Sequence, residues 1–266
     1  MNGSLSAQSG KKNNFKRKIR LIAKLDVKPP YLVKGIQLEG LRQLGEPNDY
    51  AWNYYKEGID EIIYEDVVAS LFERNSLSEI IKHATENIFI PITVGGGLRS
   101  IEDVTNALRS GADKISINTA AIKNKNIISE IAKEYGSSTV VVSIQAKKSS
   151  EKWEAYYDNG RERTYLDAVS WAQIAEELGA GELLVTSVDK EGTGQGFDIN
   201  LINEICSRVQ IPVIANGGCG NLNHIKELME NTDVDAIAIA KVLHYNQISI
   251  NELKQFCLKN SIEVRK

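Results

Sequence analysis

Ile90-Pro-Ile-Thr-Val-Gly-Gly-Gly97 and Ile211-Pro-Val-Ile-Ala-Asn-Gly-Gly218 share one pattern, an apolar run that ends in a glycine-rich turn before a helix-like segment. Two further pairs of segments match at a similar offset: Ala23–Lys28 with Ser143–Lys147, and Ala112–Asn118 with Val234–Ala240. Self-similarity at a fixed spacing indicates a duplicated unit. The sequence therefore predicts a fold of two equivalent halves.

Short apolar, β-branched runs alternate with amphipathic segments along the whole chain. We expect strands at 19–25, 61–64, 90–94, 114–117, 139–144, 182–186, 212–215 and 236–240. Helices are expected between them at 47–57, 77–86, 101–109, 125–134, 167–178, 200–209, 222–230 and 250–258. Such alternation is typical of parallel βαβ units. Eight units halved by a repeat predict a single (β/α)8 TIM-type barrel. A doubly wound open sheet is the alternative, but no G-x-G-x-x-G motif opens the first helix.

Composition narrows the class of protein. The chain has 266 residues, 42% of them apolar, which suits one barrel domain over 18–266. Residues 1–17 are rich in Ser, Gly, Asn and Lys, and we expect a disordered basic leader there. A net charge of −3 gives no sign of a nucleic-acid partner, and no apolar run is long enough for a membrane span. Three cysteines without paired spacing suggest a reducing, cytoplasmic location and no metal site.

Two long segments follow the first and fifth predicted strands, at 28–45 and 147–164. We interpret both as loops, and Asn159-Gly160 within the second predicts a type I′ hairpin turn. They occupy equivalent places in the two halves. Because loops after barrel strands line the catalytic face, both are expected beside the active site.

Glycine-rich turns between a strand and a helix are typical of anion sites, since backbone N–H groups can approach a phosphate there. One turn occurs in each half, which predicts two facing sites for a ligand with a phosphate at each end. Packing of the turns is the alternative use of these glycines. The expected phosphate-binding residues are Gly97, Asn118, Thr119, Gly192, Thr193, Gly217, Gly218, Ala240 and Lys241. No cofactor motif is present, and we expect no cofactor.

Three residues are candidates for the chemistry. Asp26 follows the first strand, where its carboxylate would point into the barrel mouth for proton transfer; a loop-capping role is the alternative. Gln145 stands at the equivalent position of the second half, and an amide can orient a ligand but cannot exchange a proton. Lys34, in the first long loop, is expected to close over the substrate, unless it is simply a solvated surface lysine.

Several motifs together resemble the cyclase subunit of imidazole glycerol phosphate synthase from about Arg20 to Arg265. The matching stretches are Leu25–Lys28, Val33–Gly35, Leu41-Arg42, Thr93–Gly97, Gly111–Ala121, Gly179–Glu182 and Glu263–Arg265. This resemblance implies a lyase that takes ammonia from a glutaminase subunit docked on the N-terminal face. The ammonia crosses the barrel and attacks a bis-phosphorylated ribulosyl substrate, giving imidazole glycerol phosphate and aminoimidazole carboxamide ribotide.

The resemblance also assigns roles at the base of the barrel. Four residues of alternating charge correspond to the family's ammonia gate: Arg20, Glu61, Lys114 and Glu182. Asp113 corresponds to a position that faces the glutaminase. A salt-bridge plug that only closes the barrel fits the four charged residues nearly as well.

This chain departs from the family's pattern at the top face. Gln145 replaces the second catalytic aspartate, Glu191 replaces an aspartate, and Lys24 and Lys241 replace small residues. These changes resemble a divergent branch associated with surface-polysaccharide genes. In that branch the barrel would activate a glutaminase and pass ammonia to a sugar amidotransferase. A sugar-phosphate isomerase working from Asp26 alone is a third interpretation.

Overall fold

The computed structural model describes residues 18–69 and 77–265, so the predicted leader at 1–17 lies outside the described residues. Eight parallel strands form the centre of the fold. They are β1 (Arg20–Lys28), β4 (Glu61–Asp66), β5 (Ile92–Gly95), β6 (Lys114–Ile117), β7 (Val140–Ser149), β10 (Glu182–Ser187), β11 (Val213–Asn216) and β12 (Ala236–Ile239). Each strand pairs with the next, and β10 pairs with both β11 and β7, so the sheet closes. The predicted (β/α)8 barrel is confirmed.

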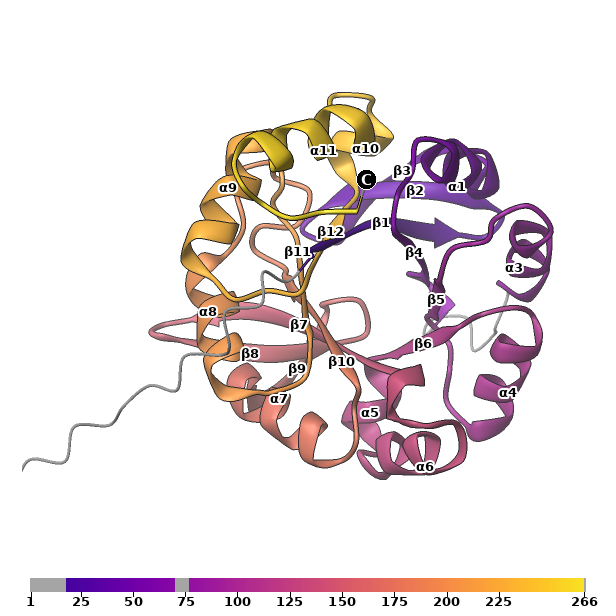
Figure 1. Cartoon of the computed structure of the whole chain (residues 1–266). Helices are drawn as coiled ribbons and strands as arrows, with labels where there is room; N and C mark the ends of the chain where they lie inside the picture. Colours follow the sequence, from indigo (N-terminus) through magenta and orange to yellow (C-terminus); the bar gives the residue numbers. More distant parts are fainter. Residues whose placement is uncertain (1–17, 70–76, 266) are drawn as a thin grey trace, which may run out of the picture.

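Helices surround the closed sheet, as Figure 1 shows with the barrel seen end-on. The longer ones are α1 (Pro47–Lys56), α3 (Ser78–Thr85), α4 (Ile101–Arg109), α6 (Asn126–Tyr135), α7 (Ala168–Glu177), α8 (Ile199–Arg208), α9 (Leu222–Asn231) and α11 (Ile250–Lys259). Two short helices, α5 (Thr119–Lys123) and α10 (Lys241–His244), follow β6 and β12, and η1 (Ser137–Thr139) is a 3-10 turn. The short pair occupies equivalent places in the two halves.

Two segments predicted as loops are β-hairpins instead. Strands β2 (Tyr31–Ile36) and β3 (Glu39–Gly45) extend from β1, and β8 (Lys152–Tyr157) and β9 (Glu162–Asp167) extend from β7. The expected two-residue turn at Asn159-Gly160 is wrong. The connection covers 158–161, and Asp158, Asn159 and Gly160 all have positive φ. A longer turn with three left-handed residues takes the place of the type I′ geometry.

Side chains fill the barrel in layers, as is usual for this fold. Charged residues lie at the base, and the middle layer is apolar. That layer consists of Ile22, Ile63, Val141, Leu184, Ile214, Ala236 and Ala238, all buried. A polar layer lies above it at the C-terminal ends of the strands. A second and larger apolar core fills the space between the strands and the helices. Among the described residues, no helix is long and apolar enough to cross a membrane.

Candidate functional site

Asp26 lies near the C-terminal end of β1 and is buried. Its Oδ2 atom is 2.8 Å from the Lys34 ammonium, and its Oδ1 atom accepts a hydrogen bond from Lys24. Burial alone would raise the pKa of the Asp26 carboxyl, but the two lysines outweigh it and hold that pKa below its usual range. The side chain is therefore fixed as a carboxylate that can accept a proton or hydrogen bond.

Lys34 lies on β2 and points into the barrel, not outward from a loop. Besides Asp26 it contacts Glu191, a buried residue of the turn after β10. Burial would lower the pKa of the Lys34 ammonium, but these two carboxylates raise it. The expected lysine over the substrate is thus a buried cation that joins the first hairpin to the mouth of the barrel.

Glu65 on β4 is a buried acidic residue that sequence reasoning missed. Its Oε2 atom is 3.8 Å from the ammonium of Lys24. Burial, helped by the charges of Asp26 and Asp66, raises the pKa of the Glu65 carboxyl against the opposing effect of Lys24. Lys24 was the sequence signal that could have found Glu65, because a lysine on a barrel strand needs acidic partners inside the barrel.

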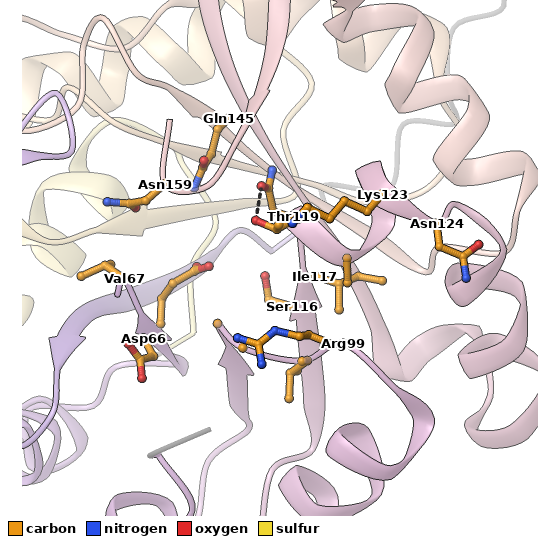
Figure 2. A pocket seen from close by; sticks show the side chains of 16 residues that line it. Asp66, Val67, Arg99, Ser116, Ile117, Thr119, Lys123, Asn124, Gln145 and Asn159 are labelled. Carbon is orange, nitrogen blue, oxygen red and sulfur yellow. Dashed lines mark hydrogen bonds between the residues drawn. The ribbon is translucent and has the colours of Figure 1, made fainter. Parts of the chain in front are cut away.

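Gln145, on β7, lies on the opposite side of the barrel from Asp26 and lines a cavity of about 280 Å³. Figure 2 shows Gln145, Ser116 and Arg99 around this cavity, which Glu65 also lines. Within residues 18–69 and 77–265, neither the Gln145 Oε1 atom nor the Ser116 Oγ atom has a hydrogen-bond partner. Buried polar atoms normally have one, so both atoms are available to a ligand.

The structure brings the first set of predicted phosphate residues together in the same cavity. Gly97, Asn118 and Thr119 all line it, and Lys123 and Arg99 add positive charge. The side chains of Asn118 and Thr119, however, have structural partners. Asn118 donates to the carbonyl oxygens of Ser143 and Tyr156 at 2.9 and 3.1 Å, and the Thr119 hydroxyl accepts from the Asp158 N–H at 3.1 Å. Gly97 has a φ of 76°, which favours glycine at this turn.

Two residues of the second predicted set line a cavity. Gly192 and Lys241 line another cavity, of about 580 Å³, together with Lys34 and Arg42. Thr193 donates its hydroxyl to the Lys190 carbonyl at 2.7 Å and so stabilises its own turn. Ala240 is buried at the start of α10.

Gly217 and Gly218 join two turns. The Gly196 N–H donates to the Gly218 carbonyl at 2.8 Å, and a Cβ atom on Gly218 would lie 2.0 Å from the Gly196 oxygen. Both glycines have positive φ. Close packing thus requires glycine at these two positions, as it does at Gly96 of the first turn, where a Cβ atom would lie 2.3 Å from the Asp66 carbonyl oxygen.

The four charged residues at the base form a closed ring. Arg20 donates to Glu61 at 2.9 Å and also to Glu182, and Lys114 lies 3.2 and 3.1 Å from the same two carboxylates. Burial would lower the pKa of the Arg20 guanidinium, but Glu182 and Glu61 raise it. Every member of the ring therefore contacts two oppositely charged partners, as a closed gate or plug requires.

Asp113 is exposed beside Lys114 at the base. Its Oδ2 atom accepts a hydrogen bond from the Ile92 N–H at 2.8 Å. Asp235, its counterpart in the second half, accepts from the Val213 N–H at 3.0 Å. Asp113 thus has a structural role at the start of β5, in addition to any contact with a partner.

A duplicated barrel with a polar mouth, a glycine-turn cavity and a charged base defines a (β/α)8 protein whose candidate site lies at the C-terminal face. Residues 20–249 match the family model described as "Histidine biosynthesis protein". A Legionella pneumophila protein is 58% identical over 205 residues, covering 77% of this chain and 97% of the relative. Proteins of Lactococcus lactis subsp. cremoris (strain SK11) and Pyrococcus furiosus are each 46% identical, covering 92% of this chain and 96% and 98% of the relatives. All three are named imidazole glycerol phosphate synthase subunit HisF. The chain therefore belongs to the histidine biosynthesis protein family, which confirms the resemblance found in its sequence.

Proposed function

We propose that this chain is the cyclase-type subunit of an imidazole glycerol phosphate synthase. It would use ammonia to convert the bis-phosphorylated ribulosyl aminoimidazole carboxamide intermediate to imidazole glycerol phosphate and aminoimidazole carboxamide ribotide. The observation that carries the proposal is the cavity formed by Gln145, Glu65 and the first glycine turn, at the C-terminal face of a barrel whose relatives have that name. A phosphate held at Gly97 would place the rest of the ligand beside Gln145 and Glu65.

A glutaminase subunit would supply the ammonia in a heterodimer. The ring of Arg20, Glu61, Lys114 and Glu182 is the gate at the base, and Asp113 lies beside it on the docking face. Above the ring, the apolar middle layer suits a small neutral molecule better than an ion, because a charge there would lose its hydration. Opening of the ring would give ammonia access to this layer. Three buried cysteine thiols, Cys206, Cys219 and Cys257, fit a cytoplasmic location.

A second candidate function rests on the altered mouth. Two lysines hold Asp26 as a carboxylate, and Gln145 has no proton to exchange. These features favour a subunit with weak turnover of its own that activates a glutaminase and passes ammonia to a sugar amidotransferase. Surface-polysaccharide synthesis would then be the pathway served.

Turnover with ammonium salt distinguishes the two functions without a partner. Purified protein is mixed with ammonium chloride and the ribulosyl substrate, and loss of substrate and appearance of both products are followed by chromatography. Cyclase function predicts turnover by the wild-type chain and little change in Gln145→Asp. Gln255→Asp, on the exposed side of α11, controls for adding a carboxylate. Absence of wild-type turnover, with activity appearing in Gln145→Asp, would favour ammonia delivery to another enzyme.

A further inference from the structure

Glu65 lies where three strands present polar groups to the same cavity. In the sheet its Cα pairs with Asp26 on β1 and with Gly95 on β5. A Cβ atom on Gly95 would lie 3.2 Å from the Glu65 Oε1 atom and 3.0 Å from the Ser116 Cβ atom. Because Gly95 has no side chain, the Glu65 carboxyl can reach across β5 toward Ser116 on β6. Its carboxyl, the Ser116 hydroxyl and the Gln145 amide oxygen therefore border one space.

The charges around Glu65 leave it incompletely balanced. Lys24 is its cationic neighbour at 3.8 Å, but that ammonium makes its closer contact with Asp26. Asp26 on β1 and Asp66 on β4 are the facing negative charges, while β5, β6 and β7 present the uncharged residues Gly95, Ser116 and Gln145. Arg99 and Lys123 are the cations that line the same cavity, and they are absent from the causes that shift the pKa of Glu65. Burial, the largest cause, raises the pKa of the Glu65 carboxyl, so it retains its proton to higher pH than an exposed glutamate.

Asp26 and Glu65 thus differ in how readily they hold a proton, as a catalytic base and a catalytic acid do. Two lysines keep Asp26 ionised, whereas Glu65 shares one lysine at longer range. Two carboxyl groups whose environments move their pKa values apart can act as base and acid in one reaction. Gln145 cannot supply the second proton-transfer group.

We propose that Glu65 is a catalytic proton donor of this cavity and performs the proton transfer that Gln145 cannot. The inference rests on the proposed cyclase function. Ammonia adds to the ketose carbonyl carbon, and one proton of the new ammonium moves to the alkoxide oxygen to give a carbinolamine. The Glu65 O–H bond then breaks, its proton passes to the carbinolamine hydroxyl, and the C–O bond breaks so that water leaves. A proton from the newly bound nitrogen then returns to the Glu65 carboxylate. Protons and charge balance over the step, and no oxidant or metal is needed.

The test measures ammonium-dependent kcat, KM and their pH profiles for wild type, Glu65→Gln and Glu65→Asp. Glu65→Gln keeps the size of the side chain but removes the proton, and kcat should fall about 10²–10⁴-fold. KM should stay within about threefold of the wild-type value, and the part of the kcat–pH profile that reports the titration of Glu65 should disappear. Glu65→Asp should retain that part of the profile at a reduced rate, which a purely structural role would not produce. Glu154→Gln removes another buried carboxylate, paired with Arg163 on the second hairpin, and should leave kcat near wild type.

Each outcome is decisive once thermal unfolding shows that the variants fold. Glu65→Gln with wild-type kcat and an unchanged pH profile would overturn the role of Glu65 while leaving the cyclase function intact. Failure of the wild-type protein to turn over substrate would overturn both proposals.

Discussion

Asp26 and Glu65 are neighbours in register on β1 and β4, yet their surroundings move their pKa values in opposite directions. Lys24 lies between them and contacts both carboxylates. A buried cation shared unequally by two acids separates their protonation without any change of backbone. The chemistry of this mouth therefore depends on where the lysine ammonium groups lie as much as on the acids themselves.

His244 gives the clearest prediction of pH dependence. Its ring is buried, with Nε2 3.0 Å from the Lys24 carbonyl oxygen and Nδ1 2.8 Å from the Tyr54 hydroxyl. A carbonyl only accepts, so Nε2 carries the proton and the neutral ring satisfies both contacts. Burial, with the charge of Lys34, lowers the pKa of His244 to about 3.

Protonation of His244 should therefore favour the unfolded chain. As pH falls from about 6.5 toward 3, the unfolded state binds a proton that the folded state does not, so stability decreases. We expect this residue to contribute up to about 1.4 kcal/mol per pH unit to that decrease. Urea unfolding between pH 4 and 7 should show a shallower slope for His244→Gln. His83→Gln, at an exposed position of α3, is the matched control, and equal slopes for wild type and His244→Gln would contradict this account.

At the residue scale, the sequence located polar residues at the ends of the strands but not which of them form ion pairs. Asp26 and Gln145 lie within β1 and β7, a little before the strand ends where the pattern placed them, and the four ring residues pair at the base as the resemblance implied. Glu65 was missed because the predicted strand ended at Tyr64, two residues before the end of β4. The pairing of Lys34 with Glu191 links residues far apart in the chain, and no local pattern encodes such a contact.

At the scale of elements, the two hairpins close over the mouth of the barrel. The Gln37 N–H donates to the Glu191 carbonyl at 2.7 Å, joining the tip of the first hairpin to the turn after β10. The Asn159 side chain donates to the Leu38 carbonyl at 3.3 Å, so the two hairpin tips also meet. Residues that bind the ligand and residues that cover it therefore belong to one connected unit.

Gly192 should be critical for this closure. It has a φ of +72°, and a Cβ atom there would lie 2.3 Å from the Gly35 carbonyl oxygen. Gly192→Ala should therefore lose about 2–4 kcal/mol of unfolding free energy or displace the first hairpin. Gly40→Ala meets the same positive φ with nothing within 4 Å, and should lose only about 1 kcal/mol. Chemical denaturation, with hydrogen exchange over residues 31–45, measures both. Equal effects of the two variants would show that close packing at Gly192 is unimportant.

The barrel elements were predictable, while of the two hairpins only the turn near Asn159 was. Helix α4 occupies the predicted range 101–109, and Ser100 and Asp103 form a capping box at its start. Buried strands can be recognised in the sequence as apolar runs. The hairpin strands β3 and β9 are largely exposed, and their few apolar residues do not alternate with polar ones, so they have no hydrophobic period.

For the whole molecule, duplication preserves architecture more strictly than chemistry. Each half has a hairpin after its first strand and a short helix after its fourth. Asp113 and Asp235 make the same hydrogen bond in the two halves. Both glycine turns pack closely against the turn after the preceding strand, whereas Gln145 takes the place of Asp26 in the second half.

This pseudosymmetry supplies a control for the partner surface. Asp113→Ala and Asp235→Ala each remove one carboxylate-to-backbone hydrogen bond, and each should lower stability by about 1–3 kcal/mol. Only Asp113→Ala should also weaken activation of the glutaminase, if that residue faces the partner. Glutamate release by the glutaminase at saturating barrel concentration measures the effect. Similar activation by both variants would remove Asp113 from the docking surface.

The central claim is that ammonia enters through the ring at the base and reacts at the opposite face. Its most direct test is turnover of the complex on amide-¹⁵N-labelled glutamine in an excess of unlabelled ammonium. Transfer through the barrel predicts that the imidazole product keeps the label, since the ammonia does not mix with bulk solvent. Product labelled only in proportion to the bulk ammonium would contradict the account.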